Sequence, residues 1–293
     1  MNLQDLMKHV RALEISARQN VTEVFAGNYK SSFRGRGMEY EDVREYTEGS
    51  DIRDIDWNIT AREGKPYVKI YREERELSTF LIVDLSSSMN FGSRDYLKKD
   101  IALQVAAILT FSIQKNNDKI GLLAYSEGVE TYIPPKKGNA HSLHILRMLL
   151  SGYQENFLKS SNLERALSFL HRVSKKRNVC FLITDEIPPN SEKLIALTNK
   201  RHDLVIIRIS DPMEKSLPQS GVFWTQNPES GAMEEINFSS GSVKQKYRKL
   251  RREKEEAFQR ILKKYAIDVI DLSTDSNIFQ ELFFFFRKRQ KRF

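Results

Sequence analysis

The chain has 293 residues, of which 40% are hydrophobic and 29% are charged, and its formal net charge is +8. This composition is that of a folded globular protein and excludes the disordered and fibrous classes. The single cysteine excludes an intramolecular disulfide and any zinc site built from several cysteines. No stretch approaches the roughly 20 apolar residues of a membrane span, and the start lacks the apolar centre of a secretion signal. We therefore expect a cytoplasmic protein.

Residues 1–76 are predicted to form an N-terminal extension. Apolar residues at helical spacing between Leu3 and Ile15 predict an amphipathic helix. A glycine-punctuated, charged region follows from Phe33 to about Gly64, and then the extended segment PYVKIYREE. We expect this extension to pack on a main domain that spans residues 77–293.

The main domain alternates apolar, strand-like runs with helical periodicity. The strand LSTFLIVDL is followed by a helical pattern that begins at Ser93, as N-cap, and continues to Ile113. Further predicted strands are KIGLLAYS, the short VETYIPP, NVCFLIT and DLVIIRI, with helices around 141–150, 162–174 and 191–200. Strands without clean alternation, separated by helices, predict an α/β fold with a doubly wound, mostly parallel, Rossmann-like sheet.

The pattern changes after Asp211. The Pro- and Gly-marked stretch SGVFWTQNPESGAMEEINF predicts a hairpin. A helix from Val243 to Tyr265 follows, with ten basic and three acidic residues. We expect this hairpin and basic helix, at about residues 212–265, to be an insertion before a last strand, AIDVIDL, and a last helix that ends in FFFF.

Oxygen-bearing side chains follow two of the predicted core strands. Asp84, Ser86 and Ser88 form D-x-S-x-S at the end of one strand, Asp185 ends another, and Ser161 opens a helix between them. In a doubly wound sheet, functional groups gather at the carboxyl ends of the strands, so these side chains can converge. Carboxylates and hydroxyls are ligands that Mg²⁺ or Mn²⁺ prefers. A capped helix start after a strand uses the same residue types, which leaves a structural role open.

This ordered set resembles the von Willebrand factor type A domain. The metal-ion-dependent adhesion site of that domain is built from D-x-S-x-S, a later threonine before a helix and an aspartate in T-D-G. The resemblance implies a site for Mg²⁺ or Mn²⁺ formed by Asp84, Ser86, Ser88, Ser161 and Asp185. Ser161 replaces the threonine and keeps its hydroxyl. Glu186 replaces the glycine and adds a carboxylate, which could attract the metal or repel an acidic ligand.

Nearly the whole chain carries a second family pattern. Its longest piece runs from Gly35 to Glu76, GRGMEYEDVREYTEGSDIRDIDWNITAREGKPYVKIYREERE, and later pieces are NDKIGLLAYS, YIPPKKG, DPMEKSLPQSG and DLSTD. These pieces resemble the bacterial family catalogued as domain of unknown function 58 (DUF58), with Ser50 where aspartate is usual. Members of that family carry a von Willebrand type A core and are commonly associated with MoxR-type AAA+ ATPases. The resemblance therefore implies such an ATPase as partner.

The long signature segment interleaves charges of both signs with apolar side chains. This pattern favours apolar anchors, with Trp57 buried against the core, and Arg–carboxylate pairs that fix the shape of the segment. The alternative is a recognition surface in which Arg44, Arg53 and Trp57, together with Glu186 beside the metal set, contact a partner directly.

The usual marks of catalysis are absent from the sequence. No G-x-S-x-G, P-loop or G-x-G-x-x-G follows a strand. Ser86 also stands where an enzyme of the haloacid dehalogenase type would need its second carboxylate. We therefore expect a non-enzymatic, metal-dependent protein-interaction module, in which an acidic residue of the partner fills an open position on the ion. The alternative is a binder of an anionic nucleic acid or membrane surface, acting through the basic helix and the tail RKRQKRF.

Overall fold

The computed structural model describes residues 17, 21, 23–33, 38–47, 50–73, 77–154, 159–215, 220–226 and 231–291. They divide into two compact units: a small unit within residues 34–77, and a main unit formed by the residues up to Phe33 together with 78–293. The first boundary therefore differs from the predicted division at residue 76, which placed everything before it in one extension. The helix predicted between Leu3 and Ile15 lies outside the described residues.

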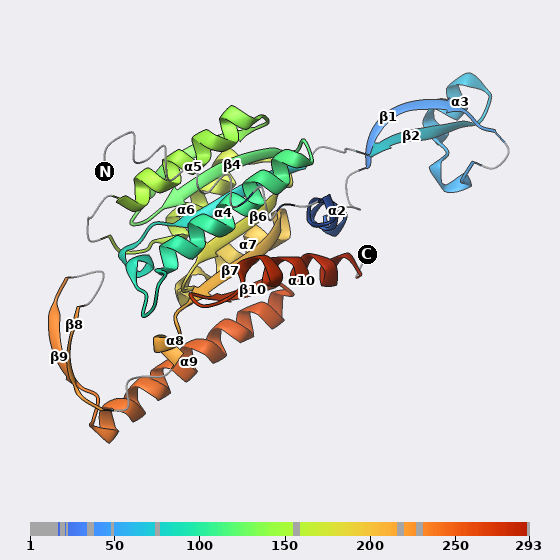
Figure 1. Ribbon diagram of the computed structural model, residues 1–293. Helices are drawn as coiled ribbons and strands as arrows, with labels where there is room; N and C mark the ends of the chain where they lie inside the picture. Colours follow the sequence, from blue (N-terminus) through green and yellow to red (C-terminus); the bar gives the residue numbers. More distant parts are fainter. Residues whose placement is uncertain are drawn as a thin grey trace. The chain divides into compact units, whose positions relative to one another are not determined.

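Six strands form the sheet of the main unit (Figure 1). Their spatial order is β10 (Asp268–Ser273), β7 (Asp203–Ser210), β6 (Val179–Thr184), β3 (Ser78–Asp84), β4 (Lys119–Tyr125) and β5 (Val129–Lys136). All neighbours pair in parallel except β5, which runs antiparallel to β4 at one edge. The central strands β3 and β6 are almost wholly buried, as expected where helices cover both faces. The predicted doubly wound, mostly parallel α/β sheet is confirmed.

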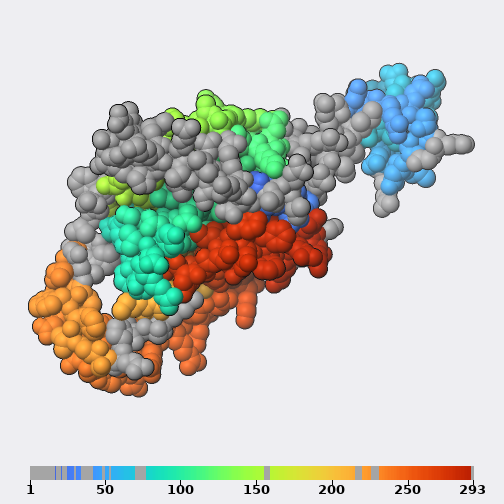
Figure 2. Space-filling model, viewed as in Figure 1, coloured from blue at the N-terminus to red at the C-terminus, as the bar shows by residue number. Residues whose placement is uncertain are grey.

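Helices cover both faces of this sheet (Figure 1). One face carries α2 (Glu23–Ser32), α4 (Lys98–Lys115), α5 (Asn139–Gln154) and α10 (Ile278–Gln290), and Figure 2 shows α4 beside α10. The opposite face carries α6 (Leu163–Val173), α7 (Glu192–Arg201) and α9 (Gly241–Tyr265). There Phe80 and Ile82 of β3 belong to the same apolar core as Leu167 of α6 and Phe258 of α9.

A buried aromatic cluster joins α2 to α10. The ring of Phe286 is fully buried, and its centroid lies 5.6 Å from those of Phe25 and Tyr29 and 6.3 Å from that of Phe181 in β6. Arg289 of α10 donates to the backbone oxygen of Ser32 and forms ion pairs with two aspartates of the sheet, Asp203 and Asp268. This packing explains why α2 belongs to the main unit.

The C-terminal insertion begins with α8 (Pro212–Lys215). The predicted hairpin is formed by β8 (Val222–Gln226) and β9 (Met233–Asn237), which pair antiparallel, and the predicted basic helix is α9. The side chains of Val222, Trp224 and Met233 are 54%, 68% and 55% exposed. Within the described ranges, no helix is both long enough and apolar enough to cross a membrane.

The small unit is built on two antiparallel strands, β1 (Met38–Glu45) and β2 (Tyr67–Glu73), with a 3-10 turn at Ile52–Asp54 and α3 (Trp57–Glu63) between them. Strand β1 was not predicted from the sequence. Asp56 caps α3 by accepting from the backbone amides of Asn58 and Ile59, and Gly64 ends it with a positive φ of 69°. Trp57 is 68% exposed, so the prediction that it is a buried anchor is wrong.

Candidate metal centre

Asp84, the last residue of β3, collects hydrogen bonds from four elements of the main unit. The residue is 1% exposed. Its Oδ1 accepts from the backbone amide of Ser86 at 2.8 Å. Its Oδ2 accepts from the hydroxyls of Ser161 at 2.9 Å, Thr184 at 3.0 Å and Tyr125 at 3.2 Å. Strands β3, β4 and β6 and the segment before α6 thus meet at one carboxylate.

The remaining predicted ligands lie around Asp84. The hydroxyls of Ser86 and Ser88 are 3.1 Å apart at the start of a 3-10 turn that follows β3. Asp185 comes directly after Thr184, and its charge raises the pKa of Asp84. The structure therefore brings all five predicted residues to the carboxyl ends of β3 and β6, where the topology of a doubly wound sheet places functional groups.

The carboxylate of Asp84 is a buried charge, and no lysine, arginine or histidine in the described part of the chain pairs with it. Burial raises the pKa of Asp84, and the neighbouring charge of Asp185 adds to this effect, while hydrogen bonds from Ser86 and Ser161 oppose it. A divalent cation would stabilise both ionised carboxylates, so the residues present fit Mg²⁺ or Mn²⁺. In the described ranges, no group of three or more His, Cys, Asp or Glu side chains is arranged to hold a metal ion. The fit therefore depends on the serine hydroxyls.

Two buried tyrosines and a threonine, none of them predicted from the sequence, complete the surroundings of Asp84. The hydroxyl of Tyr153 in α5 donates to the backbone oxygen of Asp84 at 2.6 Å. Burial raises the pKa of both Tyr125 and Tyr153 well above the ordinary value, and the charge of Asp84 raises it further. These phenols therefore stay protonated and act as donors. Thr184 was visible as the T of the T-D pattern, but only the fold shows that it bonds Asp84.

Lys98 is a second residue near the candidate ligands that was not predicted from the sequence. Its side chain is 3% exposed, and its Nζ lies 2.6 Å from Oδ2 of Asp185 and 2.8 Å from Oε1 of Glu214 in α8. Lysine in the first turn of a helix is disfavoured by the helix dipole. The sequence predicted that this helix begins at Ser93, which placed Lys98 inside it, whereas the helix begins at Lys98 itself. The position of Lys98 in the first turn was therefore not visible in the sequence.

The helical spacing predicted Ser93 as the N-cap of α4, but Ser93 does not cap this helix. Its hydroxyl and amide instead donate to the carboxylate of Asp211 at 2.5 and 2.9 Å. The helix begins at Lys98, and Leu97 is its N-cap residue. The turn before it needs Gly92, because a Cβ there would lie 2.4 Å from the backbone oxygen of Tyr96.

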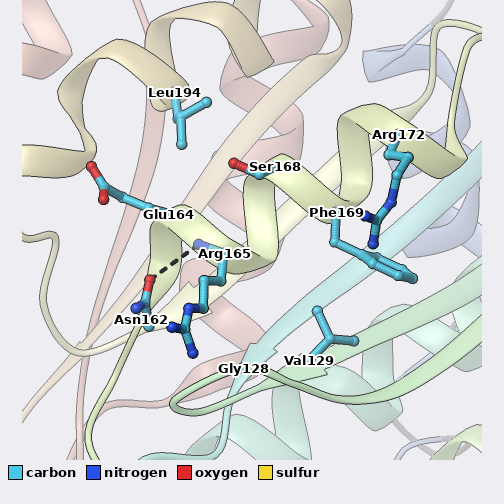
Figure 3. Close-up of a pocket in the computed structure, with 9 residues that line it drawn as sticks. All are labelled: Gly128, Val129, Asn162, Glu164, Arg165, Ser168, Phe169, Arg172 and Leu194. Atoms are coloured by element: carbon cyan, nitrogen blue, oxygen red, sulfur yellow. Dashed lines mark hydrogen bonds between the residues drawn. The ribbon is translucent and has the colours of Figure 1, made fainter.

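An open pocket with a volume of about 650 Å³ lies along α6 (Figure 3). Asn162, the residue after Ser161, lines it and caps α6 by accepting from the backbone amide of Arg165 at 3.1 Å. Further along α6, the guanidinium of Arg172 lies 5.1 Å from the ring centroid of Phe169. The pocket is lined by Gly128, Val129, Asn162, Glu164, Arg165, Ser168, Phe169, Arg172 and Leu194.

The proposed partner-contacting residues fall in both units. Glu186 is next to the candidate site, and its exposed carboxylate pairs with Lys254 of α9 at 2.8 Å. Arg44, in β1 of the small unit, donates to the hydroxyl of Ser50 at 3.4 Å. Arg53 is in the 3-10 turn, and its side chain lies outside what the structure describes. The sequence predicted these residues as one group, but Glu186 and Arg44 belong to different units.

The likeness to solved structures concerns the fold. An aerotolerance-related membrane protein from Bacteroides fragilis superposes with a TM-score of 0.50 and 13% identity, over 74% of this chain and 100% of that one. The conserved hypothetical protein BatB from Bacteroides thetaiotaomicron gives a TM-score of 0.47 and 13% identity, over 73% and 99% of the two chains. At 13% identity, the likeness to the Bacteroides fragilis protein shows a shared α/β fold and nothing further.

Sequence relatives identify the family. The uncharacterized proteins Rv1480 of Mycobacterium tuberculosis and Mb1516 of Mycobacterium bovis are each 31% identical to this chain over 229 residues. That alignment covers 78% of this chain and 72% of each relative. A family model described as "Protein of unknown function DUF58" matches residues 42–257. The chain therefore belongs to the DUF58 family.

Proposed function

We propose that the main unit is a non-enzymatic, metal-dependent protein-interaction module. Mg²⁺ or Mn²⁺ would be held by Asp84, Ser86, Ser88, Ser161 and Asp185. The observation that carries this proposal is the buried carboxylate of Asp84, which receives one amide and three hydroxyl donors and pairs with no basic side chain in the described residues. An ionised group in such surroundings is costly unless a cation compensates it.

The donor set supports a role in binding a partner. Two carboxylates and three neutral hydroxyls are fewer charged ligands than a tight, all-protein cation site uses, so the ion keeps affinity for a further anionic oxygen. An aspartate or glutamate of a partner supplies such an oxygen. The pocket along α6, which Asn162 helps to line, gives room for further side chains of the partner.

The partner that we propose is a MoxR-type AAA+ ATPase, or a client protein that it presents. This proposal rests on membership of the DUF58 family together with the chemistry of the site. A carboxylate on a partly hydrated divalent ion makes a strong contact over a small area, so one acidic residue could control the affinity.

This function is tested by measuring the affinity of the chain for a purified MoxR-type ATPase from the same organism. The affinity is measured for the wild type and for a Ser86→Ala, Ser88→Ala double variant, with Mg²⁺ and with chelator. The exposed Ser151→Ala on α5 is the matched control. We expect binding only by the wild type and the control, and only with Mg²⁺. Equal binding in all conditions would contradict the metal bridge, and no binding in any would contradict the partner.

A second candidate function is binding to an anionic surface through α9. It is favoured by the exposed basic side chains Lys246, Arg248 and Lys249, which lie close in sequence to the exposed apolar residues of β8 and β9. Binding to anionic lipid vesicles or to duplex DNA would weaken steeply with salt and would be unaffected by chelator. The opposite pattern, sensitivity to chelator with little sensitivity to salt, supports the first function.

A further inference from the structure

Lys98 is a charged side chain in an unfavourable place. It is almost completely buried, and it stands in the first turn of α4, where the helix dipole opposes a positive charge. Its ammonium forms ion pairs with the carboxylates of Asp185 at 2.6 Å and Glu214 at 2.8 Å. These two carboxylates hold the side chain in position.

Glu214 is itself held by α9. Its backbone oxygen accepts from the hydroxyl of Tyr247 at 2.8 Å and from the guanidinium of Arg251. Its second carboxylate oxygen accepts from the amide of Asp211 at 2.9 Å. Direct contacts thus run from Asp185 through Lys98 and Glu214 to α9, the helix that carries the basic surface.

These contacts determine the charge that a bound ion would meet. Of the two candidate carboxylate ligands, Asp185 forms an ion pair with Lys98, whereas Asp84 is not paired with a described basic side chain. Glu214 shares the ammonium, which leaves Asp185 more of its negative charge. Removing Glu214 would place the ammonium wholly on Asp185 and weaken the attraction for a cation.

We propose that Lys98 is a positioning residue that sets the divalent-ion affinity of the site, and that Glu214 couples this affinity to the placement of α9. The inference rests on the proposed metal site. Lys98 keeps the affinity moderate and leaves a bound ion with residual positive charge, which suits a carboxylate from a partner. A ligand on α9 that displaced α8 would release Glu214 and lower the affinity for the ion.

The test is titration of Mn²⁺ by calorimetry into the full chain. Lys98→Met, which keeps the length of the side chain without its charge, should bind Mn²⁺ roughly tenfold more tightly than the wild type, because the positive charge paired with the candidate ligand Asp185 is removed. Glu214→Gln should bind Mn²⁺ more weakly than the wild type. In the Lys98→Met background the same substitution should have a much smaller effect, because Glu214 acts through Lys98.

Two further measurements keep the outcome decisive. Lys98→Met leaves two carboxylates without their cation, so Mn²⁺ should raise its melting temperature more than that of the wild type; a variant that folds only with Mn²⁺ would agree. A Tyr247→Phe, Arg251→Met double variant should weaken Mn²⁺ binding in the same direction as Glu214→Gln, and unchanged affinity would refute the link to α9.

Failure of this inference and failure of the proposed function give different results. A wild type that binds Mn²⁺ while Lys98→Met binds it equally or more weakly would overturn this inference and leave the proposed function intact. No Mn²⁺ binding by the wild type or by Lys98→Met would overturn the proposed function itself.

Discussion

The hydroxyl of Ser161 donates to Oδ2 of Asp84 at 2.9 Å, although the two residues are 77 positions apart in the chain. The contact forms because Asp84 ends β3, while the backbone amide of Asn162 bonds the oxygen of Ser126 just after β4. Adjacent parallel strands β3 and β4 therefore bring the segment before α6 to the end of β3.

Removing this hydroxyl should weaken both the fold and the ion site. Ser161→Ala deletes one of three hydroxyl donors to a buried carboxylate, at a cost of about 1–3 kcal/mol in unfolding free energy. It should also lower Mn²⁺ affinity about tenfold, because one oxygen ligand is lost. Ser161→Thr keeps the hydroxyl and should retain most of both properties. Urea unfolding and calorimetry measure the two effects, and equal behaviour of Ala and Thr would contradict the role of the hydroxyl.

The aromatic cluster between α2 and α10 should contribute strongly to stability. Phe286→Ala leaves a cavity among Phe25, Tyr29 and Phe181, and we expect a loss of about 3–5 kcal/mol. Phe284, two positions earlier on the same helix, is 60% exposed. Its replacement by alanine should therefore change the unfolding free energy by less than about 1 kcal/mol. Chemical denaturation separates the two variants, and similar losses would show that the cluster is not the core contact between these helices.

Trp57 gives the opposite expectation from the one that its sequence context suggested. The residue is 68% exposed, so Trp57→Ala should change the unfolding free energy by less than about 1 kcal/mol. A thermal melt followed by circular dichroism is sufficient. A loss near 3 kcal/mol would mean that the indole is buried in solution.

His202 should make the fold sensitive to acid. The residue is 1% exposed, and its Nδ1 accepts from the backbone amide of Asn178. Burial lowers the pKa of His202 to about 4, with smaller contributions from the positive charges of His171, Arg201 and Arg177. In the unfolded chain its pKa returns to about 6.5. The unfolded state thus binds a proton first as the pH falls, so stability is complete above about pH 6.5 and decreases towards pH 4.

Urea unfolding at several pH values measures this dependence. His202→Gln should flatten the slope of stability against pH in that window, while replacement of the exposed His144 by glutamine should leave the slope unchanged. A slope in His202→Gln equal to that of the wild type would assign the acid sensitivity to other groups.

The sequence predicted the main sheet and the candidate ligands because both depend on local patterns. Apolar runs bounded by polar residues identified β3, β6 and β7, and the parallel topology then required Asp84 and Asp185 to lie at one edge. Contacts between residues far apart in the chain are not predicted by such local patterns. Nothing near Ser93 indicated that Asp211 would bind it, and the charged stretch that forms β1 lacks the apolar alternation of a half-buried strand.

Lys98 and Trp57 show where reasoning from residue type fails. A lysine is expected in solvent and a tryptophan in the core. Lys98 is buried because Asp185 and Glu214, 87 and 116 positions away, converge on it. Trp57 is 68% exposed in α3, a helix of the small unit with no buried residue.

The most direct test of the metal-dependent module is calorimetric titration of Mn²⁺ and Mg²⁺ into the wild type and into Asp84→Asn. This variant keeps the shape of the side chain and removes the charge on which the site depends. Circular dichroism and a melting curve establish that it is folded. The proposed function predicts saturable, one-site binding by the wild type and none by the folded variant. Equal affinity in the two proteins, or no binding by the wild type, would contradict it.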